Sequence, residues 1–169
     1  MIERYLVAAS RIRQELKDLE QVVSRAERAL AAARHRMEDQ DLYLDSAALN
    51  LHDFYSGLER IFRHIASTVD ESVPAGQEWH RDLLHQMGTS ISQIRPPVLS
   101  EESVKELDEY LRFRHVVRNI YAFEFDLERI ERLVARLKPI FPRVRTELLA
   151  FADLLELLAQ QDTTNESEP

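Results

Sequence analysis

The stretch "LDSAALNLHDFYSGLERIFRHI", residues 44–65, carries apolar side chains at intervals of three and four residues. This spacing gathers them along one stripe of an α-helix, because the helix has 3.6 residues per turn. We therefore predict a helix over about 41–70 that buries one face in a core. The stripe consists of Leu44, Ala48, Leu51, Tyr55, Leu58, Ile61, Phe62 and Ile65.

The same periodicity extends towards the N-terminus. Residues 3–38 repeat apolar side chains at helical steps without a proline or glycine, and the acidic "EDQD" predicts the end of this helix. After the turn "ESVPAG", a short helix is expected over 77–87. Three of the predicted helices thus precede residue 90.

The proline-containing connector "SQIRPPVLS", residues 92–100, separates these helices from the rest of the chain. Ser100 is a good N-cap for a fourth helix that is predicted to end near Tyr121. Asp126 is expected to cap the last helix, which the two prolines of "LKPIFPRV" should bend or break. We predict an all-α antiparallel bundle of about five helices.

The composition is that of one soluble domain. The chain has 169 residues, of which 44% are hydrophobic, and it contains three glycines and no cysteine. Disulfides and thiolate metal sites are therefore excluded. No window resembles a membrane span or a signal peptide, so we expect a cytoplasmic protein with no membrane partner. Residues 1–158 are predicted to form the domain, and 159–169 an acidic, disordered tail.

The formal net charge of −8 argues against a surface that coats nucleic acid. However, residues 111–121 contain Arg112, Arg114 and Arg118 and no acid. A local basic patch on an acidic protein is typical of a site for one small anionic target.

This patch contains the candidate site. On a helix that continues to residue 121, Arg114, Arg118 and Tyr121 fall on one strip. His115 and Asn119, four residues apart, occupy the next strip. Guanidinium groups bind phosphate, and an imidazole can act as acid or base near neutral pH.

A purely structural reading competes with this one, because the arginines could pair with Glu59, Glu124 and Asp126. The histidines lack the spacing of metal ligands, and no glycine-rich nucleotide loop is present. We therefore predict no metal site and no cofactor.

The segment "RHVVRNIY", residues 114–121, resembles the Arg-x4-His-x-Tyr signature of HepT-like proteins, which belong to the HEPN helical superfamily. The segments "LHDFYSGLERIF", "EWHRDLLHQM" and "FRHVVRNIYAFEFD" support this resemblance, which covers roughly residues 3–155. It implies a symmetric homodimer with the two motifs in a shared cleft. It also implies a toxin that acts as a metal-independent ribonuclease. The implied partner is a minimal (MntA-like) nucleotidyltransferase antitoxin that transfers AMP to the signature tyrosine.

In this resemblance the signature arginine falls on Arg114 and the tyrosine, the implied AMPylation site, on Tyr121. The histidine position falls on Asn119, whose amide cannot exchange a proton near pH 7. His115 could supply the imidazole instead, with Arg114 and Arg118 holding the RNA phosphate and Asn119 and Tyr121 positioning it. Alternatively, the chain is a catalytically weak or inactive module that binds RNA or the nucleotidyltransferase, or a purely structural dimer.

Overall fold

A computed structural model describes residues 2–121 and 124–165 of the chain. Over these residues it consists of helices and loops, with one isolated β-bridge between Ile91 and Arg95. The predicted all-α bundle of five helices is therefore confirmed. The helices are α1 (Ile2–His35), α2 (Gln40–Thr68), α3 (Trp79–Met87), α4 (Glu101–Asn119) and α5 (Leu127–Asn165), with a 3₁₀ turn η1 (Met37–Asp39) between the first two.

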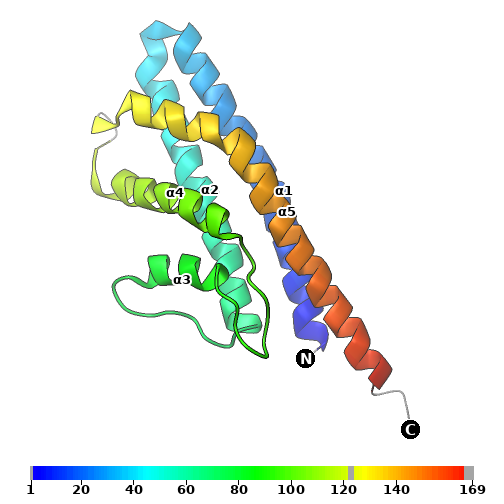
Figure 1. The fold of residues 1–169 in the computed structure, drawn as a ribbon. Coiled ribbons are helices and arrows are strands. Elements are labelled where there is room, and N and C mark those ends of the chain that lie inside the picture. The colour runs from blue at the N-terminus through cyan, green and yellow to red at the C-terminus, as the bar shows by residue number, and fades with distance from the viewer. Residues whose placement is uncertain (1, 122–123, 166–169) are drawn as a thin grey trace.

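The long helices α1 and α2 form an antiparallel hairpin, and α5 packs along α1 (Figure 1). The helices α3 and α4 lie beside α2 on the other side. Gly57 allows α1 to approach α2 closely, because a Cβ atom at this position would lie 2.6 Å from a methyl carbon of Leu19. The core at the centre of the bundle is aromatic, with the Phe54 ring 5.3 Å from Tyr110 and 5.9 Å from Phe141.

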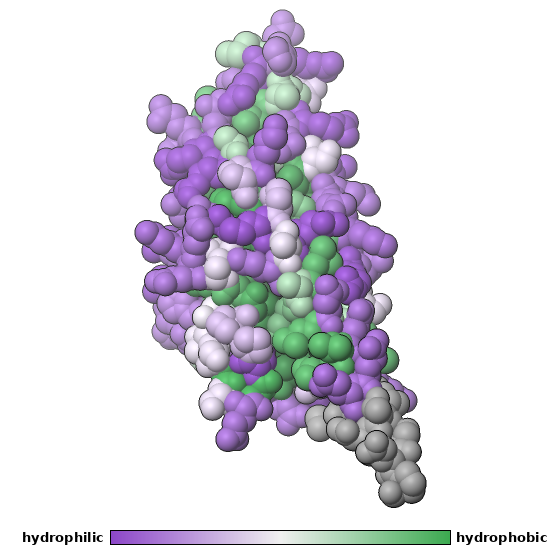
Figure 2. Space-filling model, turned by 45° about the vertical axis from the view of Figure 1, so that its right-hand side comes forward, coloured by the Kyte–Doolittle hydropathy of each residue, from purple (hydrophilic) through white to green (hydrophobic). Residues whose placement is uncertain are grey.

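Most charged side chains surround this core. The face in Figure 2 is mainly hydrophilic, with apolar areas between the hydrophilic residues. None of the helices in the described parts of the chain is both long enough and apolar enough to cross a membrane.

The connector between α3 and α4 is held by a buried ion pair. The Arg95 guanidinium donates to both carboxylate oxygens of Asp70, at 2.5 and 2.7 Å, and both side chains are 1% exposed. Arg95 also donates to three backbone carbonyls, those of Gln86, Thr89 and Pro96. Bidentate pairs of this kind fix geometry as well as charge. The pair therefore joins the end of α2 to the connector and sets where α4 begins.

The start of α4 agrees with the predicted cap, since the Ser100 hydroxyl accepts a hydrogen bond from the Ser103 backbone N–H at 3.2 Å. Asp126 likewise accepts from the Glu128 N–H at 3.0 Å at the start of α5. The helix α5 contains Pro139 and Pro142 without a break and changes direction where yellow turns to orange in Figure 1. The prediction of a bend is therefore confirmed.

The helix α5 continues beyond the predicted domain end at residue 158, as far as Asn165. The rest of the predicted tail, residues 166–169, lies outside the described residues. The disordered tail therefore stays a prediction.

Candidate functional site

The predicted site residues lie at the C-terminal end of α4. Arg114, His115, Arg118 and Asn119 are in the helix, but Ile120 is already extended, with φ −126° and ψ 162°. The helix was predicted to end near Tyr121, and it ends two residues earlier, at Asn119. Tyr121 is therefore not aligned with the two arginines on a helical strip, and the residue is 73% exposed.

Arg114 points into the bundle and is only 8% exposed. Its Nη2 lies 3.3 Å from Oε1 of Glu59, and its Nε donates to the Ser56 hydroxyl at 3.1 Å. Ser56 and Glu59 are three residues apart on α2 and so lie on the same face of that helix. A buried charge is tolerated when it is paired and hydrogen-bonded. Glu59 therefore offsets the cost of burying the Arg114 guanidinium.

His80 of α3 completes this buried cluster. Its Nδ1 lies 2.5 Å from Oε2 of Glu59 and 3.3 Å from Nη1 of Arg114. One ring nitrogen cannot donate to the carboxylate and accept from the guanidinium at the same time. We assign the Nδ1 proton to the shorter contact, in which His80 donates to Glu59. Glu59 therefore lies between two donors, and the three residues form the Glu59–His80–Arg114 cluster.

The imidazole of His80 is held between two other rings. The indole of Trp79 stacks on it with ring centroids 3.5 Å apart, and His115 meets it nearly edge-on at 5.7 Å. The guanidinium of Arg63 lies over the Trp79 ring at 5.2 Å. The orientation of the His80 ring is therefore fixed from α2, α3 and α4 together.

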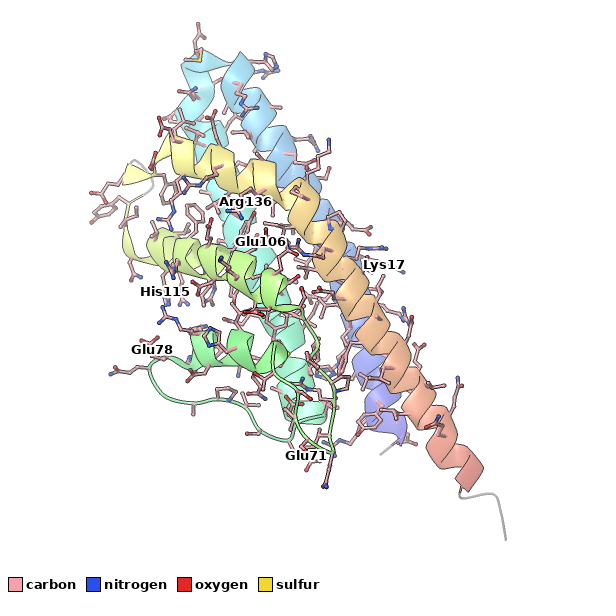
Figure 3. The ribbon with its side chains drawn as sticks, viewed as in Figure 1. Lys17, Glu71, Glu78, Glu106, His115 and Arg136 are labelled. Carbon is pink, nitrogen blue, oxygen red and sulfur yellow. The ribbon has the colours of Figure 1, made fainter. Side chains whose placement is uncertain are left out.

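A small cavity of about 60 Å³ opens between the start of α3 and the end of α4. His80 and His115 both line it, so two imidazole groups border one space. Figure 3 labels His115 on α4 and Glu78 just before α3 on the same side of the molecule. The other residues that line the cavity are Gln77, Glu78, Arg81, Leu111 and Arg112.

The last turn of α4 is exposed. The Asn119 amide donates to the His115 backbone carbonyl at 2.6 Å, so this side chain folds back onto the last turn of its own helix. Arg118 forms no ion pair with any acid in residues 2–121 or 124–165. Arg112 pairs with Asp108 at 2.6 Å. Of the three arginines in this segment, Arg118 therefore has the guanidinium available to an anion.

The predicted alternative, in which the arginines pair with acids, holds for Arg114 and Glu59. The pairs predicted with Glu124 and Asp126 are not found among the described side chains. The described residues also contain no group of three or more acidic or histidine side chains that could hold a metal ion.

A buried phenol lies next to the Glu59–His80–Arg114 cluster. The Tyr55 hydroxyl is buried and has no hydrogen-bond partner among the described residues. Burial, and then the negative charge of Glu59, raise the pKa of this phenol above its usual range. Tyr55 therefore remains neutral beside the cluster and adds no charge to it.

From the sequence, residues 77–87 were expected to form a short helix, and His80 was not connected to the site. A signal for this connection exists. Glu59 lies four residues after Tyr55 and three before Phe62, on the apolar stripe of α2. A carboxylate at a core position requires a partner, and its partners are the functional candidates Arg114 and His80.

A family model described as HepT-like protein matches residues 46–155. The matched part runs from α2 into α5 and includes Glu59, His80 and the whole of α4. Neither a curated protein nor a solved structure matches the chain. The Glu59–His80–Arg114 cluster thus lies entirely within the matched part.

Proposed function

The chain belongs to the HepT-like protein family, and from this membership we propose that it is the toxin of a toxin–antitoxin pair. The family indicates a HEPN-type toxin module. Beyond this, we propose a cytoplasmic, metal-independent endoribonuclease with its site in the cleft of a homodimer. Its proposed partner is a minimal nucleotidyltransferase antitoxin that silences it by AMPylation.

The observation that supports cleavage is that an exposed imidazole lies next to a guanidinium that forms no ion pair with the described acids. His115 and Arg118 are three residues apart on the exposed last turn of α4 and are therefore neighbours. A guanidinium can hold the scissile phosphate and stabilise the charge that develops on it. The imidazole can exchange a proton near neutral pH.

The other site residues take supporting roles in this proposal. Arg114 is committed to Glu59, so it contributes positive charge from behind the site, and the first phosphate contact falls to Arg118. Asn119 holds the end of α4 through the His115 carbonyl. Two copies of the site in a homodimer would double the positive field, which helps an acidic protein to meet RNA.

Tyr121 is the proposed AMPylation site. The residue is 73% exposed and follows directly after the basic turn, so a second protein can reach it. In the transfer, the phenol oxygen forms a bond to the α-phosphorus of ATP, the bond from this phosphorus to pyrophosphate breaks, and the phenol proton passes to solvent. AMP at this position adds negative charge next to Arg118 and would block access to the cleft.

A second candidate function is a binding module that binds RNA or the nucleotidyltransferase and does not cleave RNA. Two observations favour it: Asn119 cannot exchange a proton, and the Arg114 guanidinium is already held by Glu59. This candidate predicts binding that weakens with salt and no cleavage in any buffer.

The test is cleavage of total tRNA and messenger RNA by the purified protein in the presence of a chelator. Arg118→Ala should lower the rate by about 100-fold, in the range for loss of one charge-stabilising donor. Lys105→Ala is the matched control, because Lys105 is exposed on the same helix, away from the site, and should keep the native rate. Equal rates for the native protein and Arg118→Ala would overturn the role of Arg118.

A further inference from the structure

We propose that His80, held by Glu59, is the general base of the site and that His115 is the general acid. This role rests on the proposed ribonuclease function and deepens it. The signature histidine position is occupied by Asn119, so the reaction needs another imidazole, and the described part of the chain brings His80 to the same cavity as His115.

The contact between Glu59 and His80 has the geometry of an oriented base. With Nδ1–H donated to the carboxylate at 2.5 Å, the lone pair of the neutral ring lies on Nε2. A buried carboxylate in this position fixes the tautomer and stabilises the imidazolium that forms when the ring takes a proton. The Glu59 side chain is 7% exposed and that of His80 is 14% exposed, so water competes little for this contact.

The charges that face His80 come from three helices. Glu59 of α2 favours the protonated ring, while Arg114 of α4 opposes it from 3.3 Å. Arg63 of α2 acts across the Trp79 ring, and His115 meets the ring edge-on. The carboxylate of Glu59 is the closest of these groups to the ring and also contacts Arg114, so one buried carboxylate orients His80 and faces the positive charge that the ring acquires when it takes a proton.

The reaction step balances within these groups. The 2′-hydroxyl gives its proton to Nε2 of His80, and its oxygen forms a bond to phosphorus. The bond from phosphorus to the 5′-oxygen breaks, and the protonated His115 gives its proton to that oxygen. The products are a 2′,3′-cyclic phosphate and a 5′-hydroxyl, and exchange with water restores both imidazoles.

The decisive variant is His80→Asn. The asparagine side-chain amide can replace Nδ1–H as a donor to Glu59, but it provides no base at the Nε2 position. We expect kcat to fall by about 100-fold or more with KM little changed, as for loss of a general base. The acidic limb of the pH–rate profile should disappear, while the thermal unfolding midpoint should stay near that of the native protein. His85→Asn, an exposed position on the same helix, is the matched control and should leave the rate unchanged.

The outcomes separate the two claims. An inactive native protein overturns the ribonuclease function and this role with it. An active native protein with an equally active His80→Asn variant overturns the role of His80 alone. The same holds for a variant that is slower but keeps the acidic limb.

If His80→Asn does not fold, a measurement on the native protein tests the same role. Long-range proton–nitrogen NMR of the native protein should find neutral His80 with its proton on Nδ1. A proton on Nε2 would overturn the proposed role, because the base would then point at Glu59.

Discussion

The guanidinium of Arg114 lies 3.3 Å from the carboxylate of Glu59, and both residues are buried between α2 and α4. This relationship changes how the site must be tested. An Arg114→Ala variant removes a positive charge but also leaves Glu59 buried beside His80 alone. Loss of activity in that variant would mix catalysis with stability, whereas Arg118 and His80 can be tested separately.

We predict that Glu59→Gln destabilises the fold by about 3 kcal/mol, because it leaves the buried Arg114 charge without a counter-charge. Urea unfolding measures this directly. The control is Glu71→Gln, which breaks an exposed pair with Arg4 and should cost less than about 1 kcal/mol. Similar effects from the two variants would show that the Glu59–Arg114 pair is not buried in solution.

Replacing each of two buried tyrosines by phenylalanine should change the free energy of unfolding in opposite directions. Tyr55→Phe removes a buried hydroxyl that has no partner among the described residues and should stabilise the protein by about 1 kcal/mol. Tyr110→Phe removes a hydroxyl that donates to the Leu133 carbonyl at 2.7 Å and should destabilise it by about 1 kcal/mol. Thermal or urea unfolding of both variants checks this pair, and equal signs would contradict it.

The same tyrosines predict a loss of stability at alkaline pH. Burial raises the pKa of Tyr55 and of Tyr110 in the folded protein, and the usual value is 10.0. Both phenols stay neutral in the fold while the unfolded chain releases their protons. Stability is therefore fully present below about pH 10 and falls above it, by about 1.4 kcal/mol per pH unit for each group. Tyr55→Phe should make this fall less steep, and an unchanged slope would refute the assignment to Tyr55.

AMPylation should occur on Tyr121. Incubation of the protein with ATP and a minimal nucleotidyltransferase of the proposed partner class, followed by peptide mass spectrometry, should find AMP on this residue and no modification in Tyr121→Phe. Tyr43→Phe, which removes a phenol far from the site, should still be modified. AMP on another residue would refute the site.

Several features of the fold could be predicted from residue patterns because they depend on local chemistry. The stripe around Tyr55 and Phe62 predicted α2, and Ser100 predicted the start of α4. The end of α4 could not be predicted in the same way. The apolar Val116, Val117 and Ile120 continue the helical period, whereas the chain becomes extended at Ile120, after Asn119 has bonded back to the His115 carbonyl.

The continuity of α5 depends on packing rather than on local preference. Its two prolines remove backbone donors, but Leu137, Ile140 and Phe141 around them are buried against the rest of the bundle. This burial offsets the lost hydrogen bonds, so the helix bends without breaking.

The contacts within the candidate site could be predicted even less well, because they join different helices. Arg114 could be selected from the sequence, but it contacts Glu59, a residue of another helix that lies more than fifty positions earlier in the chain. His80 reaches the site only because α3 lies beside α4, an arrangement that periodicity does not contain. Helical spacing also places Arg114 and Arg118 on the same strip, although Arg114 is buried and Arg118 is exposed.

The most direct measurement is cleavage of RNA by the native protein with a chelator present, with product ends identified and Asn119→His assayed beside it. The ribonuclease account predicts that the native protein cleaves and leaves 2′,3′-cyclic phosphate ends. A silent native protein, with activity gained by Asn119→His, would contradict it and indicate a binding module whose catalytic group has been exchanged.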